Sequence, residues 1–189
     1  MTPDDARAQL DRLATDEPVI YQDAWRWFVA QGPAAAPTLV GGLEERALGS
    51  VCHWRILLIL RELRLPSTLP AILRAFRAAV ARENVIVLPG ALEALAVFDD
   101  DDAWAALTSA LDLGDPHAVS HAAVLLAHKG GARAEQAIAR LLVRPEMRWR
   151  QAGVAALLRI DSETARATLA RHRASETDPD VLKLFERTP

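Results

Sequence analysis

The sequence has 189 residues, of which 51% are hydrophobic and only 5% aromatic, and its formal net charge is −3. These values exclude a disordered chain, a disulfide-stapled miniprotein and a globally basic nucleic-acid binder. Alanine and leucine, with 36 and 27 residues, make up a third of the chain. This composition favours helices and leaves few side chains for catalysis.

Helix-starting and helix-ending residues divide the chain into short segments. Thr2-Pro3-Asp4-Asp5 combines an N-cap, a proline in the first turn and acids near the positive helix end. Asp115-Pro116 and Asp178-Pro179 repeat this arrangement, and Gly32 and Gly130 are typical of helix ends. These signals predict twelve helices, at residues 3–15, 18–31, 33–44, 49–63, 67–81, 84–98, 102–113, 116–128, 132–143, 146–159, 162–173 and 177–187.

The segments follow an internal repeat of 30 to 36 residues. One series of equivalent positions lies in every second helix, at Val51, Val87, Val119 and Trp149. A second series lies in the helices between them, at Leu39, Ile72, Leu107 and Ile138. Two interleaved helical series with one spacing predict a repeated helical hairpin. We therefore expect an all-α fold in which residues 1–189 form a single repeat domain with a continuous core.

Two proline–aliphatic pairs, Pro37 with Leu39 and Pro70 with Ile72, precede turns, and the turn at residues 114–119 contains Asp-Pro. This pattern, together with segment 148–160, resembles the HEAT repeat, and more closely the short bacterial HEAT-like repeats named for phycobilisome lyases. The resemblance implies a right-handed α-solenoid of about six hairpins. It also implies that the second helix of each hairpin lines a concave wall that holds partners.

The third repeat departs from this pattern. The interval from Val51 to Val87 is 36 residues, and Pro89-Gly90 falls inside the next helix. Because proline lacks a backbone N–H and clashes with the preceding turn, we expect a kink or a late helix start there. This irregularity has two interpretations. It is a feature of helix packing, or it has a function as a hinge or a ligand-binding notch.

The net charge conceals a segregation along the chain. Residues 83–128 contain eight acidic side chains and no Lys or Arg, whereas residues 129–173 carry a net charge of +6. If neighbours in sequence are neighbours in space, an acidic midsection lies beside a basic flank. Either these are solvated faces, or the run from Asp99 to Asp102 attracts a basic partner. A further alternative is that Asp101 or Asp102 caps the following helix.

Three histidines, His117, His121 and His128, occupy one side of a predicted helix. This ridge could make partner binding sensitive to pH. We do not expect a metal site, because zinc needs three or four ligands and His128 is too far along the helix. Cys52 and His53 point in different directions on a helix, so we expect Cys52 to be a small buried hydrophobe and not a nucleophile.

The five tryptophans are the other scarce side chains. Trp104 and Trp149 fall on apolar stripes and are expected in the core. Trp25, Trp27 and Trp54 lie on second helices and are either core residues or interface anchors. The candidate partner-binding residues are Asp99, Asp100, Asp101, Asp102, His117, His121, His128, His53, Gln151, Arg148, Arg150 and Trp54.

These features predict a non-enzymatic, protein-binding scaffold, adaptor or inhibitor, for example an immunity or assembly factor, that grips a protein partner on its concave face. We expect no catalytic residue, cofactor, metal or membrane segment. Nucleic acid is not an expected partner, because the acidic block repels phosphate. The acidic N-terminus and the single cysteine favour the cytoplasm.

Two alternatives remain, both implied by the resemblance. One is a lyase or chaperone-lyase-like activity on a prosthetic group, and the other is a HEAT-like DNA-binding or glycosylase activity. Self-association through the apolar last helix is a further possibility.

Overall fold

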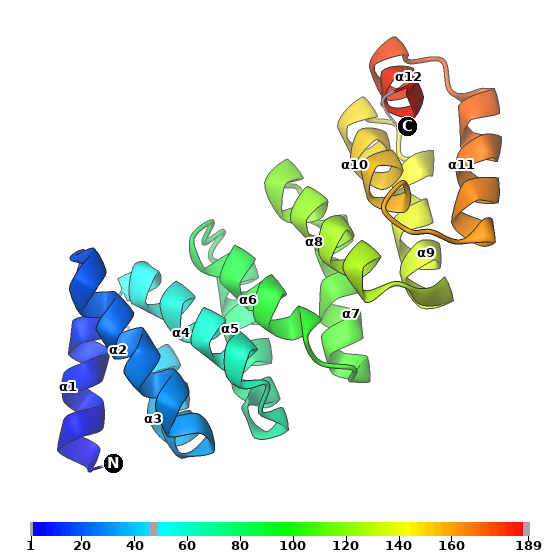
Figure 1. Cartoon of the computed structure of the whole chain (residues 1–189). Coiled ribbons are helices and arrows are strands. Elements are labelled where there is room, and N and C mark those ends of the chain that lie inside the picture. The colour runs from blue at the N-terminus through cyan, green and yellow to red at the C-terminus, as the bar shows by residue number, and fades with distance from the viewer. Residues whose placement is uncertain (1, 46–48, 187–189) are drawn as a thin grey trace. The chain divides into compact units, whose positions relative to one another are not determined.

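The computed structural model describes residues 2–45 and 49–186, and within these ranges the chain forms twelve α-helices joined by turns and short 3₁₀ segments, without a strand (Figure 1). The all-α class and all twelve helices predicted from the sequence are confirmed. The predicted end of the last helix, residue 187, lies outside the described residues. None of the described helices is long and apolar enough to span a membrane.

The chain divides into two compact units, residues 1–106 and 107–189. The prediction of a single domain over residues 1–189 stays a prediction. The first unit contains six complete helices and most of a seventh, which crosses the boundary. They are α1 Pro3–Ala14, α2 Pro18–Gln31, α3 Ala36–Glu44, α4 Gly49–Leu63, α5 Leu69–Ala81, α6 Val87–Ala96 and α7 Asp101–Ser109.

The second unit contains the remaining five α-helices. They are α8 Pro116–Lys129, α9 Gly131–Ala139, α10 Met147–Leu157, α11 Glu163–Ser175 and α12 Pro179–Glu186.

Within each unit the helices form two layers. In the first unit, α2 packs on α4 and α4 on α6, while α1 packs on α3 and α3 on α5. In the second unit, α8 packs on α10 and α10 on α12, while α9 packs on α11. The even-numbered helices are the second helices of the predicted hairpins. This stacking of like on like is what a helical repeat uses to bury apolar stripes that no single hairpin can cover.

The helix starts predicted at Thr2 and at Asp115 are capped by side chains. Thr2 Oγ1 accepts a hydrogen bond from Asp5 N, and the Asp5 carboxylate accepts one from Thr2 N, which forms a capping box. The Asp115 carboxylate accepts bonds from His117 N and Ala118 N at the start of α8. These side chains satisfy backbone donors that the helix itself leaves unpaired.

Four predicted helices are partly 3₁₀. The predicted helices 33–44 and 67–81 begin with 3₁₀ turns at Gly32–Ala35 and Pro66–Thr68. The predicted helices 102–113 and 132–143 end in 3₁₀ turns at Ala110–Asp112 and Arg140–Val143. In each case the chain keeps its helical direction and tightens to i→i+3 bonding, which is common at helix ends.

The predicted late start near Pro89 is confirmed. α6 begins at Val87, so Pro89 is the third residue of the helix, where its missing N–H costs no intrahelical bond. Asn84 Oδ1 accepts bonds from Ile86 N and Val87 N, both 3.1 Å, and caps the shortened helix. Gly90 lies against Trp54 of α4, which fits the packing alternative, and a hinge or ligand notch here stays a prediction.

One buried cation joins the first two hairpins. Arg55 on α4 is only 6% exposed, and its Nη1 donates to the Leu13 carbonyl oxygen at 2.6 Å and to that of Thr15. Its guanidinium carbon also lies 3.8 Å from the centre of the Tyr21 ring on α2. The guanidinium group therefore donates hydrogen bonds to carbonyl oxygens at the end of α1 that have no partner within the helix.

Candidate functional site

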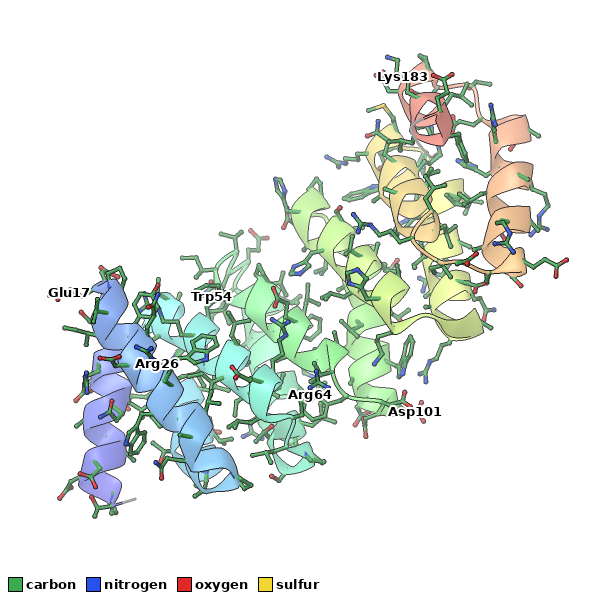
Figure 2. All side chains as sticks on the ribbon, viewed as in Figure 1. Glu17, Arg26, Trp54, Arg64, Asp101 and Lys183 are labelled. Atoms are coloured by element: carbon green, nitrogen blue, oxygen red, sulfur yellow. The ribbon has the colours of Figure 1, made fainter. Side chains whose placement is uncertain are left out.

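Exposed apolar side chains gather at the N-terminal ends of the even-numbered helices of the first unit. On α4, Val51 and Trp54 are one turn apart and are 37% and 36% exposed. Val85 and Ile86, just before α6, are 70% and 45% exposed. We call these four side chains the Trp54 surface; Figure 2 shows the position of Trp54 near the start of α4.

The Trp54 surface is held in place from two sides. Asn84 Nδ2 donates to Ser50 Oγ at 2.9 Å, which ties the segment before α6 to the first turn of α4. The Trp54 ring lies so close to α6 that a Cβ on Gly90 would be 2.7 Å from Trp54 Cδ1. Glycine at this position therefore makes room for the indole, and the ring is fixed although one face is open to solvent.

The C-terminal halves of the same helices are joined by polar contacts. Trp25 Nε1 on α2 donates to Glu62 Oε2 on α4 at 3.0 Å, and Arg61 on α4 pairs with Glu93 on α6 at 2.7 Å. Trp27 is half-buried and packs edge-on against Phe28, with ring centres 5.1 Å apart. Of the three tryptophans that the sequence left open between core and anchor, Trp54 is thus the one with the most exposed position.

The tryptophans predicted to lie in the core are confirmed there. Trp104 is 7% exposed and Trp149 is 5% exposed. Trp104 also donates from Nε1 to Asp99 Oδ1 at 2.9 Å, which satisfies the polar end of the buried ring.

Cys52 is a buried hydrophobe, as predicted. Its Sγ lies 4.0 Å from the Leu10 carbonyl oxygen, and burial raises the pKa of the thiol to about 11. His53 turns away from it, with Nε2 3.0 Å from the Glu45 carbonyl oxygen. The neighbouring pair therefore has neither the thiolate nor the geometry of a nucleophile and its base.

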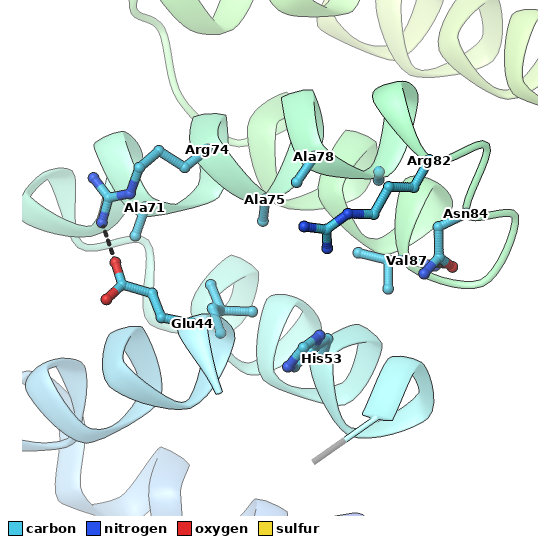
Figure 3. Close-up of a pocket in the computed structure, with 11 residues that line it drawn as sticks. Glu44, His53, Ala71, Arg74, Ala75, Ala78, Arg82, Asn84 and Val87 are labelled. Carbon is cyan, nitrogen blue, oxygen red and sulfur yellow. Dashed lines mark hydrogen bonds and ion pairs between the residues drawn. The ribbon is translucent and has the colours of Figure 1, made fainter. Parts of the chain in front are cut away.

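His53 instead lines a pocket of about 290 Å³ in the first unit (Figure 3). Residues from α3, α4, α5 and the turn before α6 surround it. They include Arg74 of α5, Arg82 directly after α5, and Glu44 of α3, whose carboxylate pairs with Arg74 at 2.8 Å. The sequence singled out only His53 among these residues.

Some side chains of the acidic run Asp99 to Asp102 accept hydrogen bonds from nearby residues. Asp100 Oδ1 accepts from Asp102 N at 2.8 Å at the start of α7. The prediction that Asp101 or Asp102 is the cap is therefore wrong by one residue, because the helix begins at Asp101. Asp99 is bonded to Trp104, and Asp100 and Asp102 line a second pocket together with arginines of α5. Binding of a partner by this run stays a prediction.

The charge blocks of the sequence interleave in space. In the first unit, Glu93 of the acidic block pairs with Arg61. In the second unit, Asp112 pairs with Arg140 and Arg144 of the basic block, at 2.8 and 2.9 Å. Because each pair cancels charges that the sequence counts in different blocks, the two fields are weaker than their sums of −8 and +6 suggest.

The predicted histidine ridge lies on α8. His117 and His128 are exposed, whereas His121 is half-buried and has partners of its own. Among the described residues, no three His, Cys, Asp or Glu side chains are grouped closely enough to hold a metal ion. The pH-sensitive partner binding that the ridge suggested stays a prediction.

Arg150, another predicted partner-binding residue, is part of a buried cluster in the second unit. Its Nε donates to Glu176 Oε2 at 2.7 Å and its Nη1 donates to the Pro145 carbonyl oxygen at 2.6 Å. The Glu176 side chain is 3% exposed, and His172 Nε2 lies 3.1 Å from its Oε2. Arg150 therefore joins α10 to the segment after α11 and is not available on a free surface.

The Arg150 cluster perturbs both neighbouring groups. The hydrogen bond from Arg150 lowers the pKa of Glu176 to about 2, against the opposing effect of burial. Burial lowers the pKa of His172, although Glu176 opposes this shift. The sequence pointed to neither residue, because Glu176 lies 26 positions from Arg150 and between two predicted helices.

The remaining predicted residues of α10 have mixed positions. Arg148 is exposed, and its guanidinium carbon lies 4.6 Å from the centre of the Trp149 ring. Gln151 is half-buried. Both residues belong to the second unit, whereas the Trp54 surface belongs to the first.

No protein-family model matches this sequence, and no curated protein matches it significantly. Among solved structures, the chain is similar to human deoxyhypusine hydroxylase in complex with glycerol. The match covers 97% of this chain and 94% of that one, with 12% sequence identity and a TM-score of 0.44.

This comparison corrects one expectation. The sequence predicted that the chain is not an enzyme, because side chains of catalytic types are sparse. The solved structure to which the chain is similar is named a hydroxylase, which contradicts this expectation. The hydroxylase activity belongs to that protein, and at this level of similarity it is not transferred to the present chain.

Proposed function

We propose that the chain is a protein-binding module and that the Trp54 surface is where its partner docks. One observation carries this proposal: Trp54 is 36% exposed while its ring is fixed against Gly90. Tryptophan is the residue most enriched at the energetic centre of protein interfaces. A ring that is already ordered loses little conformational entropy when a partner covers it.

The surroundings of Trp54 fit the same function. Val51, Val85 and Ile86 supply the apolar area, and the pair of Arg61 and Glu93 lies further along the same two helices. An apolar centre with a polar margin is the usual anatomy of a protein interface. The partner expected here presents a pocket or an apolar ridge that accepts an indole.

This role is compatible with an adaptor or an inhibitor, such as an immunity or assembly factor. We also retain, as part of the proposal, that the repeats are of the phycobilisome-lyase type and that the even-numbered helices form the partner-binding wall.

The test compares Trp54→Ala with Val143→Ala. Val143, in the second unit, is 85% exposed and serves as a matched apolar control. We expect wild type and Val143→Ala to capture one stoichiometric protein partner from native lysate of the source organism. Trp54→Ala should bind that partner at least ~30-fold more weakly, since central tryptophans contribute about 2 kcal/mol or more.

The proposal is contradicted if Trp54→Ala captures the partner as well as wild type does. It is also contradicted if a bilin or damaged DNA co-purifies in place of a protein. Far-UV circular dichroism of each variant checks that the helices remain folded.

A further inference from the structure

The pocket beside His53 lies near the end of α3, along the part of α5 that follows Arg74. α3 has 9 residues and α5 has 13. The end of α3 meets α5 where Glu44 pairs with Arg74 at 2.8 Å, and α5 continues beyond that point. The following residues that line the pocket, Ala75, Ala78 and Ala79, have only methyl groups. The result is a pocket of about 290 Å³ with one wall of alanines.

Two basic side chains from different elements face this space. Arg82, at the end of α5, extends its guanidinium group along the alanine wall, and the His53 ring lies across the pocket from it on α4 (Figure 3). No carboxylate among the described residues forms an ion pair with the Arg82 guanidinium group. The five guanidinium donors of Arg82 are therefore left to solvent or to a ligand.

The balance of charge favours an anion. The lining contains two arginines and a single carboxylate, that of Glu44. Because this carboxylate already pairs with Arg74, the exposed Arg82 side chain at the pocket has no carboxylate partner among the described lining residues. Asn84 is also at the wall, but its amide is used by Ser50, Ile86 and Val87, so it adds little to recognition.

The geometry points to a carboxylate-binding site, which we propose as an additional function of this protein, independent of the Trp54 surface. The planar guanidinium fork of Arg82 matches the two oxygens of a carboxylate, and a single cation without a carboxylate partner matches a monoanion. The alanine methyl groups, with Leu43 and Val87, would cover a short apolar body. The carboxylate comes either from a free small acid or from an acidic side chain of another protein.

The experiment is a titration followed by NMR of the side-chain signals of Arg82 and His53. The probes are butyrate and its neutral analogue butyramide. We expect saturable shifts with butyrate, with a dissociation constant on the order of 1 mM for so small a ligand, and no saturation with butyramide.

Two arginines, Arg77 in α5 and the exposed Arg82 directly after it, provide the matched variants. Arg82→Gln should weaken butyrate binding at least ~10-fold, because it removes a charge-assisted bidentate contact. Arg77→Gln should bind butyrate as wild type does, since Arg77 does not line this pocket. Unchanged melting temperatures establish that both variants are folded.

A third probe, N-acetylglutamic acid amide, distinguishes the two sources. Its only carboxylate is a side chain, so binding tighter than that of butyrate indicates a protein-borne acid, and weaker binding indicates a free small acid. Equal shifts with butyrate and butyramide overturn the proposal, as does butyrate binding that Arg82→Gln leaves unaltered. Because Trp54 takes no part in these titrations, failure of the Trp54 proposal leaves this result intact.

Discussion

At the scale of single residues, the second unit depends on a carboxylate that is almost completely buried. Glu176 accepts two bonds from Arg150 and two from the backbone N–H groups of Thr177 and Asp178. A buried carboxylate is costly unless its oxygens are satisfied, and here every contact favours the charged form. The cluster is therefore expected to respond to acid.

Glu176→Gln tests this dependence. The folded-state pKa of about 2 lies below the ordinary value of 4.5, so Glu176 stabilises the fold above about pH 4.5. That contribution is lost as the pH falls towards 2. We expect the variant to be about 2 kcal/mol less stable than wild type at pH 7, and the difference to vanish near pH 2.

Urea denaturation at a series of pH values measures this difference. Asp161→Asn is the matched control, because Asp161 also pairs with an arginine, Arg166, but its side chain is 95% exposed. This control should change stability by no more than about 0.5 kcal/mol. A Glu176→Gln variant that behaves like the control at pH 7 would show that the cluster does not stabilise the fold.

At the scale of elements, α4 and α6 pack so closely that a Cβ at position 90 would clash with Trp54. A Cβ on Gly90 would lie 2.7 Å from Trp54 Cδ1 and 3.3 Å from the Trp54 carbonyl oxygen. Either the indole or the helix must move to accommodate it. Since the indole is the centre of the proposed docking surface, this contact links the packing of two helices to function.

Gly90→Ala should therefore destabilise the fold by about 1–2 kcal/mol, despite the better helix propensity of alanine. The tryptophan fluorescence should also change as the ring is displaced. Gly41→Ala, in α3, is the control, because nothing lies within 4 Å of its added Cβ. It should stabilise the protein by up to about 1 kcal/mol, and the opposite order of the two variants would refute this account.

The sequence predicts the helices well because their starts have local causes. Thr2-Pro3 and Asp115-Pro116 form caps within a few residues of themselves, and Pro89 forces a late start. The tightening of Ala110–Asp112 to 3₁₀ has no comparable signal, since alanine and leucine suit both geometries.

The candidate sites are harder to predict because they depend on contacts between distant residues. The helical period places Trp54 on a second helix, but it cannot show that the indole packs against Gly90, 36 residues later. The pocket depends on where α3 ends, and Arg82 is one of 20 arginines in the sequence. Charge sums along the chain likewise miss pairs such as Arg140 with Asp112.

At the scale of the whole molecule, two compact units share one helix. The boundary falls between residues 106 and 107, inside α7 Asp101–Ser109. A helix is a cooperative element, so melting one part of α7 weakens the rest. We therefore expect the units to unfold together, in agreement with the predicted single domain.

Hydrogen exchange across a urea titration measures this cooperativity. The slowest amides of α4, in the first unit, and of α10, in the second, should report the same free energy of unfolding within about 1 kcal/mol. A clearly lower value for one unit would show that the chain consists of two separately stable domains.

The buried Arg55 bears on how such a chain can change in evolution. Repeat proteins commonly gain or lose hairpins at their ends, because each repeat contacts only its neighbours. Here the guanidinium group is satisfied by carbonyl oxygens of Leu13 and Thr15 and by the Tyr21 ring. Deleting the first hairpin would leave a positive charge on α4 without these partners. We therefore expect loss of the first hairpin to destabilise α4, so this hairpin should be harder to exchange than one whose neighbours hold no buried charge.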